Sequence, residues 1–232
     1  MTQDQIFLES EGDAWFRRNR KALESAAEHD WPLRLIDKHL QLDSNSSVLE
    51  VGCANGWRLA ELERRYGCQC VGLDLSAEAI AAGRKGWPHL RLYRAGLGVD
   101  RGTWIKDTDW LKGWPYDVVI CHFVLHWLVR DNVLKALDNL NRSVGEHGHL
   151  IIGDFLPDWP TKTPYHHREG LWTYKLDYAH LFEATANYKR IERVVFDHDS
   201  HEEGDMGIPA WKRCAVTLLR KEDRYEEGLG RA

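Results

Sequence analysis

The stretch Ser47-Val-Leu-Glu-Val-Gly-Cys-Ala-Asn-Gly56 decides how the rest of this chain is interpreted. Its first half, residues 47–51, has the apolar character of a short buried strand. Gly52 and Gly56 then mark a turn, and a helical pattern of apolar residues follows over 57–66. A turn built on glycine lets a ligand lie against the backbone where a side chain would block it. We therefore expect a strand–turn–helix unit that binds a ligand.

A second apolar run, residues 70–73, ends in Asp74. In a parallel sheet, this carboxylate would lie at the same edge as the glycine turn. An acid at the tip of the second strand can accept hydrogen bonds from the two hydroxyl groups of a ribose. Together, the turn and the acid predict a cofactor that contains a nucleoside.

The spacing of the glycines separates two classes of nucleoside cofactor. Dinucleotide sites use G-x-G-x-x-G, whose glycines let a pyrophosphate approach a helix N-terminus. Here the pattern is Gly52-x-x-x-Gly56, with Ala54 between the glycines and Trp57 after them. This spacing disfavours a nicotinamide oxidoreductase. It resembles motif I of the class I S-adenosylmethionine-dependent methyltransferases, Glu/Asp-x-Gly-x-x-x-Gly, except at Ala54, where that family more often has glycine.

The resemblance covers residues 45–155 and implies a Rossmann-like α/β fold. This fold is a seven-stranded, mostly parallel sheet with helices on both faces and an antiparallel last strand. The implied cofactor is S-adenosylmethionine, with its methionine part at the glycine turn and its ribose at Asp74. No metal ion is expected. The residues expected at the cofactor are Glu50, Gly52, Cys53, Ala54, Asn55, Gly56, Asp74 and Leu75, then Gly96 and Leu97 beside the adenine, and His122 and Phe123 after the fourth strand.

Length and composition limit the function classes. The 232 residues suit one α/β domain with added elements. We divide them into an N-terminal helical cap, residues 1–44, and a methyltransferase domain, residues 45–232. A net charge of −5 argues against a general nucleic-acid binder. The sequence has neither a long apolar run nor a signal-peptide pattern, which predicts a cytoplasmic protein without a membrane span. The five cysteines fit buried thiols in a reducing compartment.

Strand-like and helix-like segments alternate along the chain, which predicts a mostly parallel sheet covered on both faces. Strands are expected at 47–51, 69–73, 90–94, 117–121, 148–153, 190–197 and 212–220. Helices are expected at 13–28, 32–41, 57–66, 76–85, 131–144 and 171–184, so the first two precede the first strand. Two longer segments, 96–115 and 154–170, follow strands, so we expect them to be binding loops at the carboxyl edge of the sheet.

Methyl transfer to oxygen or nitrogen often needs a base for the acceptor's proton. The segment after the fourth strand contains His122 and His126. We take His126 as the preferred base, because the pKa of histidine lies near neutral pH. His166 and His167 are the next candidates. Adjacent side chains of an extended segment point to opposite sides, so at most one of these two faces the site.

The acceptor is expected against the second long loop and the segment that follows it. Aromatic walls with a cation suit a polyhydroxylated or phosphorylated molecule. The residues expected to form these walls are Tyr165, Arg168, Trp172 and Tyr178. Near the N-terminus, Trp15 is expected to close over the cofactor, with Arg18 reaching its carboxylate. The structural alternatives for the two clusters are a surface lid with incidental charges and an amphipathic helix packed on the domain.

The sequence therefore predicts a methyltransferase that O-methylates a small polar acceptor: a sugar, a glycan precursor or a hydroxylated specialised metabolite. Segments 13–19 and 164–178 resemble those of bacterial methyltransferases found among surface-glycan and specialised-metabolite genes, which implies such an acceptor. N-methylation of an amine or a peptide-derived metabolite is the alternative. A non-catalytic cofactor-binding protein is the alternative of another class. The expected partner is the small acceptor, and neither nucleic acid nor a membrane is expected.

Overall fold

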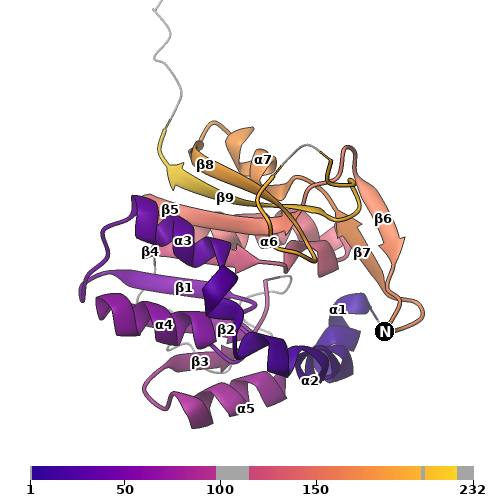
Figure 1. The fold of residues 1–232 in the computed structure, drawn as a ribbon, viewed down its shortest axis with the longest axis horizontal. Coiled ribbons are helices and arrows are strands. Elements are labelled where there is room, and N and C mark those ends of the chain that lie inside the picture. Colours follow the sequence, from indigo (N-terminus) through magenta and orange to yellow (C-terminus); the bar gives the residue numbers. More distant parts are fainter. Residues whose placement is uncertain (1, 98–114, 205–206, 224–232) are drawn as a thin grey trace, which may run out of the picture.

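The computed structural model describes residues 2–97, 115–204 and 207–223. In these residues a seven-stranded sheet runs in the order β3-β2-β1-β4-β5-β9-β8, with helices on both faces (Figure 1). Strands β1 to β5 pair in parallel, whereas β9 is antiparallel to both β5 and β8. The predicted fold class is confirmed, including the antiparallel last strand.

The seven strands of the sheet lie within a few residues of their expected positions. They are β1 Ser47–Val51, β2 Gln69–Asp74, β3 Arg91–Arg94, β4 Tyr116–His122, β5 Val144–Phe155, β8 Tyr188–Asp197 and β9 Arg213–Lys221. The α-helices are α1 Gln3–Ile6, α2 Gly12–Leu23, α3 Trp31–His39, α4 Trp57–Tyr66, α5 Ala77–Gly86, α6 Arg130–Ser143 and α7 Tyr178–Glu183. Shorter or irregular turns are η1 Phe7–Glu11, η2 Ala26–His29 and η4 Leu125–Trp127. None of the helices in the described ranges combines the length and apolarity that a membrane span requires.

Burial on both faces explains the apolar strands at the centre of the sheet. Val48 packs in a core with α3 and α4, whereas Leu49 and Val51 pack in a second core with α6 and α7. This division follows from the strand geometry, since successive side chains point to opposite faces. The five cysteines are all buried and free, as expected.

One expected helix is wrong in its first half. Within 171–184, residues Trp172–Lys175 form strand β7, which pairs antiparallel with β6, Thr161–Pro164. The aromatic and β-branched side chains of Trp172, Thr173 and Tyr174 favour a strand. The helix α7 begins only at Tyr178, where the Asp177 side chain accepts a hydrogen bond from the His180 amide (3.1 Å). The loop expected at 154–170 therefore contains half of a hairpin, and most of the loop expected at 96–115 lies outside the described residues.

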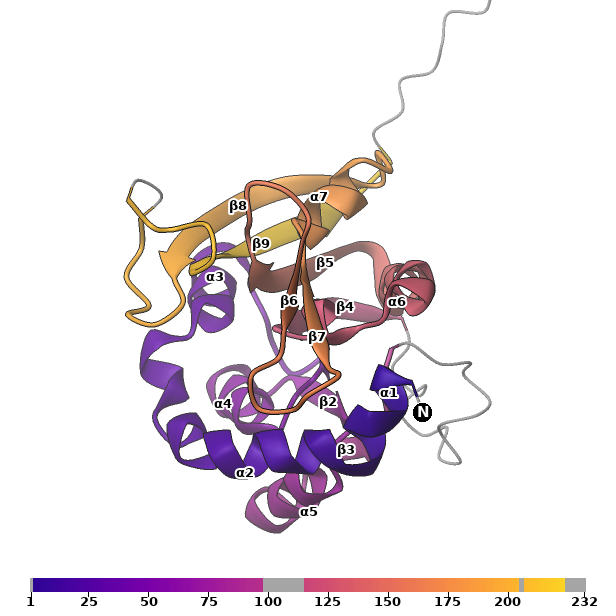
Figure 2. The same ribbon diagram turned by 90° about the vertical axis from the view of Figure 1, so that its right-hand side faces the viewer.

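The N-terminal helices lie along the carboxyl edge of the sheet, next to the β6–β7 hairpin (Figure 2). The Asp13 carboxylate accepts hydrogen bonds from the Ser76 hydroxyl (2.6 Å) and the Glu78 amide (3.0 Å), which attaches α2 to α5. At the other end, the Gln3 amide donates to the carbonyl oxygens of Trp127 (2.5 Å) and Trp172 (2.8 Å). The cap is therefore fixed to both sides of the edge where ligands bind in this type of sheet.

Packing of α5 against the glycine turn gives a stability prediction. A Cβ atom at Gly83 would lie 2.3 Å from the carbonyl oxygen of Asn55 and 2.5 Å from a methyl group of Leu92. Since the turn backbone must move to make room, Gly83→Ala should lower the free energy of unfolding by about 1–3 kcal/mol in a urea titration. Gly86→Ala in the same helix is the control, because nothing lies within 4 Å of its Cβ position. Equal stability of the two variants would contradict this packing.

Candidate functional site

The glycine turn has the backbone conformation that its sequence predicts. Gly52 and Gly56 have φ angles of 75° and 79°, in the left-handed region that favours glycine. A Cβ atom at Gly52 would also lie 2.2 Å from a methyl group of Val124, so this position has no room for a side chain. The amides of Gly52 and Cys53 both donate to the Leu73 carbonyl oxygen, at 2.7 and 3.0 Å. These bonds hold the turn against the end of β2.

Asp74 contacts the turn directly. One carboxylate oxygen accepts a hydrogen bond from the Ala54 amide (2.8 Å), and the other accepts from the Ser76 amide (2.8 Å). Burial raises the pKa of Asp74, against the opposite effect of these hydrogen bonds. A carboxylate has about four lone-pair positions, so both oxygens can still accept a hydroxyl proton. The acid therefore shapes the turn and stays available to a ligand.

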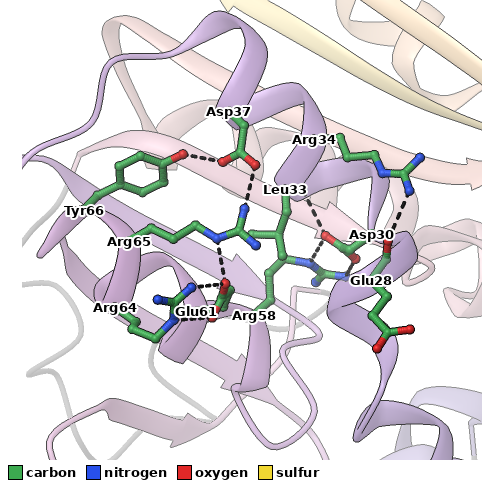
Figure 3. Close-up of polar contacts among 10 residues, drawn as sticks. All are labelled: Glu28, Asp30, Leu33, Arg34, Asp37, Arg58, Glu61, Arg64, Arg65 and Tyr66. Carbon is green, nitrogen blue, oxygen red and sulfur yellow. Dashed lines mark hydrogen bonds and ion pairs between the residues drawn. The ribbon is translucent and has the colours of Figure 1, made fainter.

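A buried guanidinium joins four elements below the turn. Arg58, in the first turn of α4, donates to both carboxylate oxygens of Asp30, at 3.0 and 2.7 Å (Figure 3). Asp30 also caps α3 by accepting from the Leu33 amide (2.9 Å). Arg58 further contacts Glu50 on β1, and its Nη2 lies 3.1 Å from Nδ1 of His122 at the end of β4. One cation thus connects β1, α3, α4 and the tip of β4.

This network sets the protonation states around it. Burial alone would raise the pKa of Asp30, but the charge and hydrogen bonds of Arg58 outweigh it and lower that pKa. Burial raises the pKa of Glu50 to about 7, although Arg58 opposes the shift. Burial, reinforced by the charge of Arg58, lowers the pKa of His122 to about 3. His122 is therefore neutral at neutral pH, and its Nδ1 accepts from Arg58, which leaves the ring proton on Nε2.

A cavity of about 570 Å³ opens at this edge of the sheet. It extends from the cap and the glycine turn, past the end of β4, to the segment after β8. Eleven of the residues expected at the cofactor line it: Trp15, Glu50, Gly52, Cys53, Ala54, Asp74, Leu75, Gly96, Leu97, His122 and Phe123. Three others, Arg18, Asn55 and Gly56, are not among the lining residues.

His126, the preferred base, lies behind the cavity wall. Its ring is buried, and Nδ1 lies 2.9 Å from an oxygen of Asp154 without a well-aligned hydrogen bond; the backbone amide of His126 donates to Asp154 instead (3.2 Å). Phe123 and Trp127 both line the cavity, and both pack against the His126 ring, with centroid distances of 6.2 and 4.6 Å. His126 is not itself a lining residue. The imidazole of His126 therefore lies behind the cavity wall and does not form part of it.

The residues expected at the acceptor hold the cap to the hairpin instead of lining the cavity. The Tyr165 hydroxyl accepts from Arg18 (2.6 Å) and donates to Glu11 (3.3 Å). Arg168 donates to the Ser10 hydroxyl (2.6 Å). These contacts join the hairpin to η1 and α2. They also engage Arg18, which the sequence assigns to the cofactor carboxylate.

Four further residues expected at the site, two catalytic candidates and two substrate candidates, lie outside the cavity wall. His166 and His167 are exposed, with ring centroids 3.9 Å apart. The Trp172 amide donates to the Gln3 side chain (2.9 Å), and the buried Tyr178 hydroxyl contacts Arg130 (3.0 Å). None of these four sequence candidates lines the cavity.

The structure adds lining residues that sequence reasoning missed. They come from η2, the start of α3 and the end of β8 with its following loop: His29, Trp31, Phe196, His198 and His201. The sequence carries a signal for the last group, because Asp197-His-Asp-Ser-His201 is dense in titratable side chains directly after a strand. Since β9 is antiparallel to both β5 and β8, the end of β8 meets the same edge as the glycine turn. Within the described ranges, no group of three or more metal-ligating side chains is arranged to hold a metal ion.

Residues 16–192 match a family model described as a methyltransferase domain. The fold is similar to that of N-methyltransferase NodS from Bradyrhizobium japonicum WM9 in complex with S-adenosylhomocysteine (TM-score 0.56, 20% identity, 84% of this chain and 86% of that chain). It is also similar to 1,6-didemethyltoxoflavin-N1-methyltransferase from Burkholderia thailandensis (TM-score 0.68, 16% identity, 95% of this chain and 90% of that chain).

Two curated relatives match over shorter lengths. An uncharacterized protein of Rickettsia prowazekii (strain Madrid E) is 29% identical over 139 residues, which are 56% of this chain and 54% of that protein. An uncharacterized methyltransferase of Schizosaccharomyces pombe is 28% identical over 122 residues, which are 47% of this chain and 41% of that protein. The chain thus spans about half or less of the length of these relatives.

The buried cation gives the second prediction. Arg58→Met leaves Asp30 and Glu50 buried without their counter-ion, which should lower the free energy of unfolding by about 3–5 kcal/mol near neutral pH. Without the cation, burial raises the folded-state pKa of both acids above its unfolded value. The folded variant then binds protons that the unfolded chain does not. Its loss of stability relative to wild type should therefore shrink as the pH falls toward about 5.

Denaturant titrations at several pH values measure this effect. Arg64→Met is the matched control in the same helix, because the Arg64 side chain is 70% exposed and pairs with Glu61 at the surface (Figure 3). It should stay close to wild type at every pH. If the loss of stability in Arg58→Met relative to wild type instead grew as the pH falls, the assigned charges would be wrong.

Proposed function

This chain belongs to the methyltransferase-domain family, and we propose that it transfers the methyl group of S-adenosylmethionine to an oxygen of a small polar acceptor. One observation carries the proposal: a single cavity joins the glycine turn and Asp74 to a region lined by aromatic and imidazole side chains. Its volume of about 570 Å³ lies within the range of small-molecule sites, roughly 300–1,000 Å³. A cofactor and a small acceptor would meet inside it.

In this proposal, the residues that line the cavity bind the cofactor. Asp74 would accept hydrogen bonds from the ribose hydroxyls, and the backbone of Gly52, Cys53 and Ala54 would hold the methionine part. Leu75 and the Gly96–Leu97 segment would flank the adenine. Trp15 would cover the cofactor from the cap, and His122 and Phe123 would line its sulfonium end. Asn55 and Gly56 shape the turn, and Arg18 supports the cap through Tyr165.

The reaction is an in-line displacement at the methyl carbon, so the protein must align two molecules and exclude water. The cap, whose Phe7, Trp15 and Leu23 line the cavity, would shield the reacting groups from water. His122 is fixed as a neutral donor by Arg58 and serves as an orienting group. His126, whose backbone amide donates to Asp154, packs behind the wall residues Phe123 and Trp127 and is likewise an orienting group.

Oxygen is the favoured target atom because a hydroxyl group must lose its proton during transfer. Imidazole side chains, which accept protons near neutral pH, line the cavity. N-methylation is the second candidate, because aromatic walls also suit a cationic amine. Both solved structures described above are named as N-methyltransferases.

Transfer of a labelled methyl group to a metabolite extract tests the function. The expected product is an O-methylated small molecule, identified by mass spectrometry. An N-methylated product would replace the first candidate with the second. Binding of S-adenosylhomocysteine without methyl transfer to any acceptor would instead indicate a non-catalytic cofactor-binding protein.

The role of Asp74 gives the third prediction. Asp74→Ala should weaken binding of S-adenosylhomocysteine by about 1.5–3 kcal/mol, since charged hydrogen bonds to the ribose are lost. Asp74→Asn keeps one acceptor oxygen and should lose less. Calorimetric titration measures both affinities, and thermal unfolding checks that the variants fold. Asp131→Ala, at an exposed position of α6, is the control. Unchanged affinity in folded Asp74→Ala would remove this acid from the site.

A further inference from the structure

One region of the cavity lies between the start of α3 and the loop after β8. We call it the acceptor lobe and define it by His29, Trp31, Phe196, His198 and His201. Phe123, at the end of β4, also lines the cavity and contacts the ring of His198. Since we place the sulfonium near Phe123, the lobe adjoins the proposed position of the reacting methyl group.

Flat side chains form the walls of the acceptor lobe. The rings of Trp31 and Phe196 lie 6.1 Å apart, and the imidazole of His201 stacks on Phe196 with an interplanar angle of 14°. Phe123 meets the ring of His198 edge-on, with centroids 5.7 Å apart. Aromatic faces and edges at these separations pack well against another flat ring. The shape of the walls thus favours a planar ligand over a puckered one.

Apart from its imidazoles, the acceptor lobe offers few polar atoms to a ligand. Asp30, beside Trp31, is occupied by Arg58. The indole Nε1 of Trp31 is buried and has no hydrogen-bond partner among the described residues. Lys175 is not a lining residue, and its Nζ lies 3.7 Å from the centroid of the Phe155 ring. The imidazoles of His29, His198 and His201 are therefore the polar groups left for a ligand, and they suit a ring with one or two hydroxyl groups better than a sugar or a phosphate with many oxygens.

His198 is the histidine of the lobe that is arranged to take a proton. Its Nδ1 lies 3.0 Å from Asp199, which in turn pairs with Lys212 at 2.5 Å. Hydrogen bonds from Lys212 and His198 lower the pKa of Asp199 to about 2, so this carboxylate is ionised. An ionised carboxylate at Nδ1 keeps the ring proton there and leaves the Nε2 lone pair available. The His198 side chain is 46% exposed, which gives the proton a route to solvent.

We propose, resting on the proposed methyltransferase function, that the acceptor is a hydroxylated aromatic ring held in the acceptor lobe and that His198 accepts its hydroxyl proton. The O–H bond breaks as the proton moves to Nε2 of His198. The oxygen forms a bond to the methyl carbon, and the C–S bond breaks with its electron pair moving to sulfur. The products are an aryl methyl ether, neutral S-adenosylhomocysteine and an imidazolium that releases its proton to water.

Binding is tested with the protein loaded with S-adenosylhomocysteine. Catechol should shift the imidazole NMR signals of His198 and His201, whereas N-acetylglucosamine should leave them unchanged. The His198 signal is assigned by its loss in His198→Gln. Shifts caused by N-acetylglucosamine alone, or by neither compound, would overturn the proposal.

Turnover tests the proton acceptor with catechol and the more acidic 4-nitrocatechol as methyl acceptors. His198→Gln should lower turnover of catechol about 10²-fold, the usual contribution of a general base. The loss should be much smaller for 4-nitrocatechol, because its hydroxyl group ionises without help. His180→Gln, at an exposed position of α7, is the control and should match wild type. Equal losses for both acceptors, or no loss, would overturn the role of His198.

The outcomes separate this inference from the function on which it rests. Transfer of labelled methyl to a sugar or an aliphatic amine in an extract, with neither catechol used, would overturn the aromatic acceptor and leave the methyltransferase function intact. Failure to bind S-adenosylhomocysteine at all would overturn the proposed function itself.

Discussion

A buried cation constrains the whole carboxyl edge of this sheet. Arg58 is 6% exposed, so its charge must be paired inside the protein. Its partners Asp30, Glu50 and His122 come from three other elements, and their contacts fix the start of α3, β1 and the tip of β4 relative to α4. Burial and, after it, the charge of the same cation lower the pKa of His122 and keep it neutral. The positions of the glycine turn on one side and of the acceptor lobe on the other depend on this pairing.

The glycine turn and Asp74 form the second constraint. The turn needs glycines with left-handed φ angles. Asp74 accepts one hydrogen bond from the Ala54 amide in the turn and another from the Ser76 amide that follows β2. These are local requirements on short segments, which is why they can be recognised in the sequence. The resemblance to class I S-adenosylmethionine-dependent methyltransferases, first seen in residues 50–56, is confirmed by the family match and the strand order.

Long-range contacts explain what could not be predicted. Tyr165 resembles a substrate residue in the sequence, yet its hydroxyl bonds to Arg18, 147 residues away. His126 has the position of a base after the fourth strand, but packing of Phe123 and Trp127 places it behind the wall. The position of His198 could have been predicted from the strand order, because a final antiparallel hairpin places the end of β8 at the ligand-binding edge of the sheet. No local pattern shows that Asp30 and Arg58 meet.

A crystal structure with S-adenosylhomocysteine would show directly where the cofactor binds. We expect its ribose hydroxyls to contact Asp74 and its sulfur to lie beside Phe123 and face the acceptor lobe. A methyl group on that sulfur would then point toward His198. A ribose bound away from Asp74, or a sulfur that faces the β6–β7 hairpin, would contradict the account.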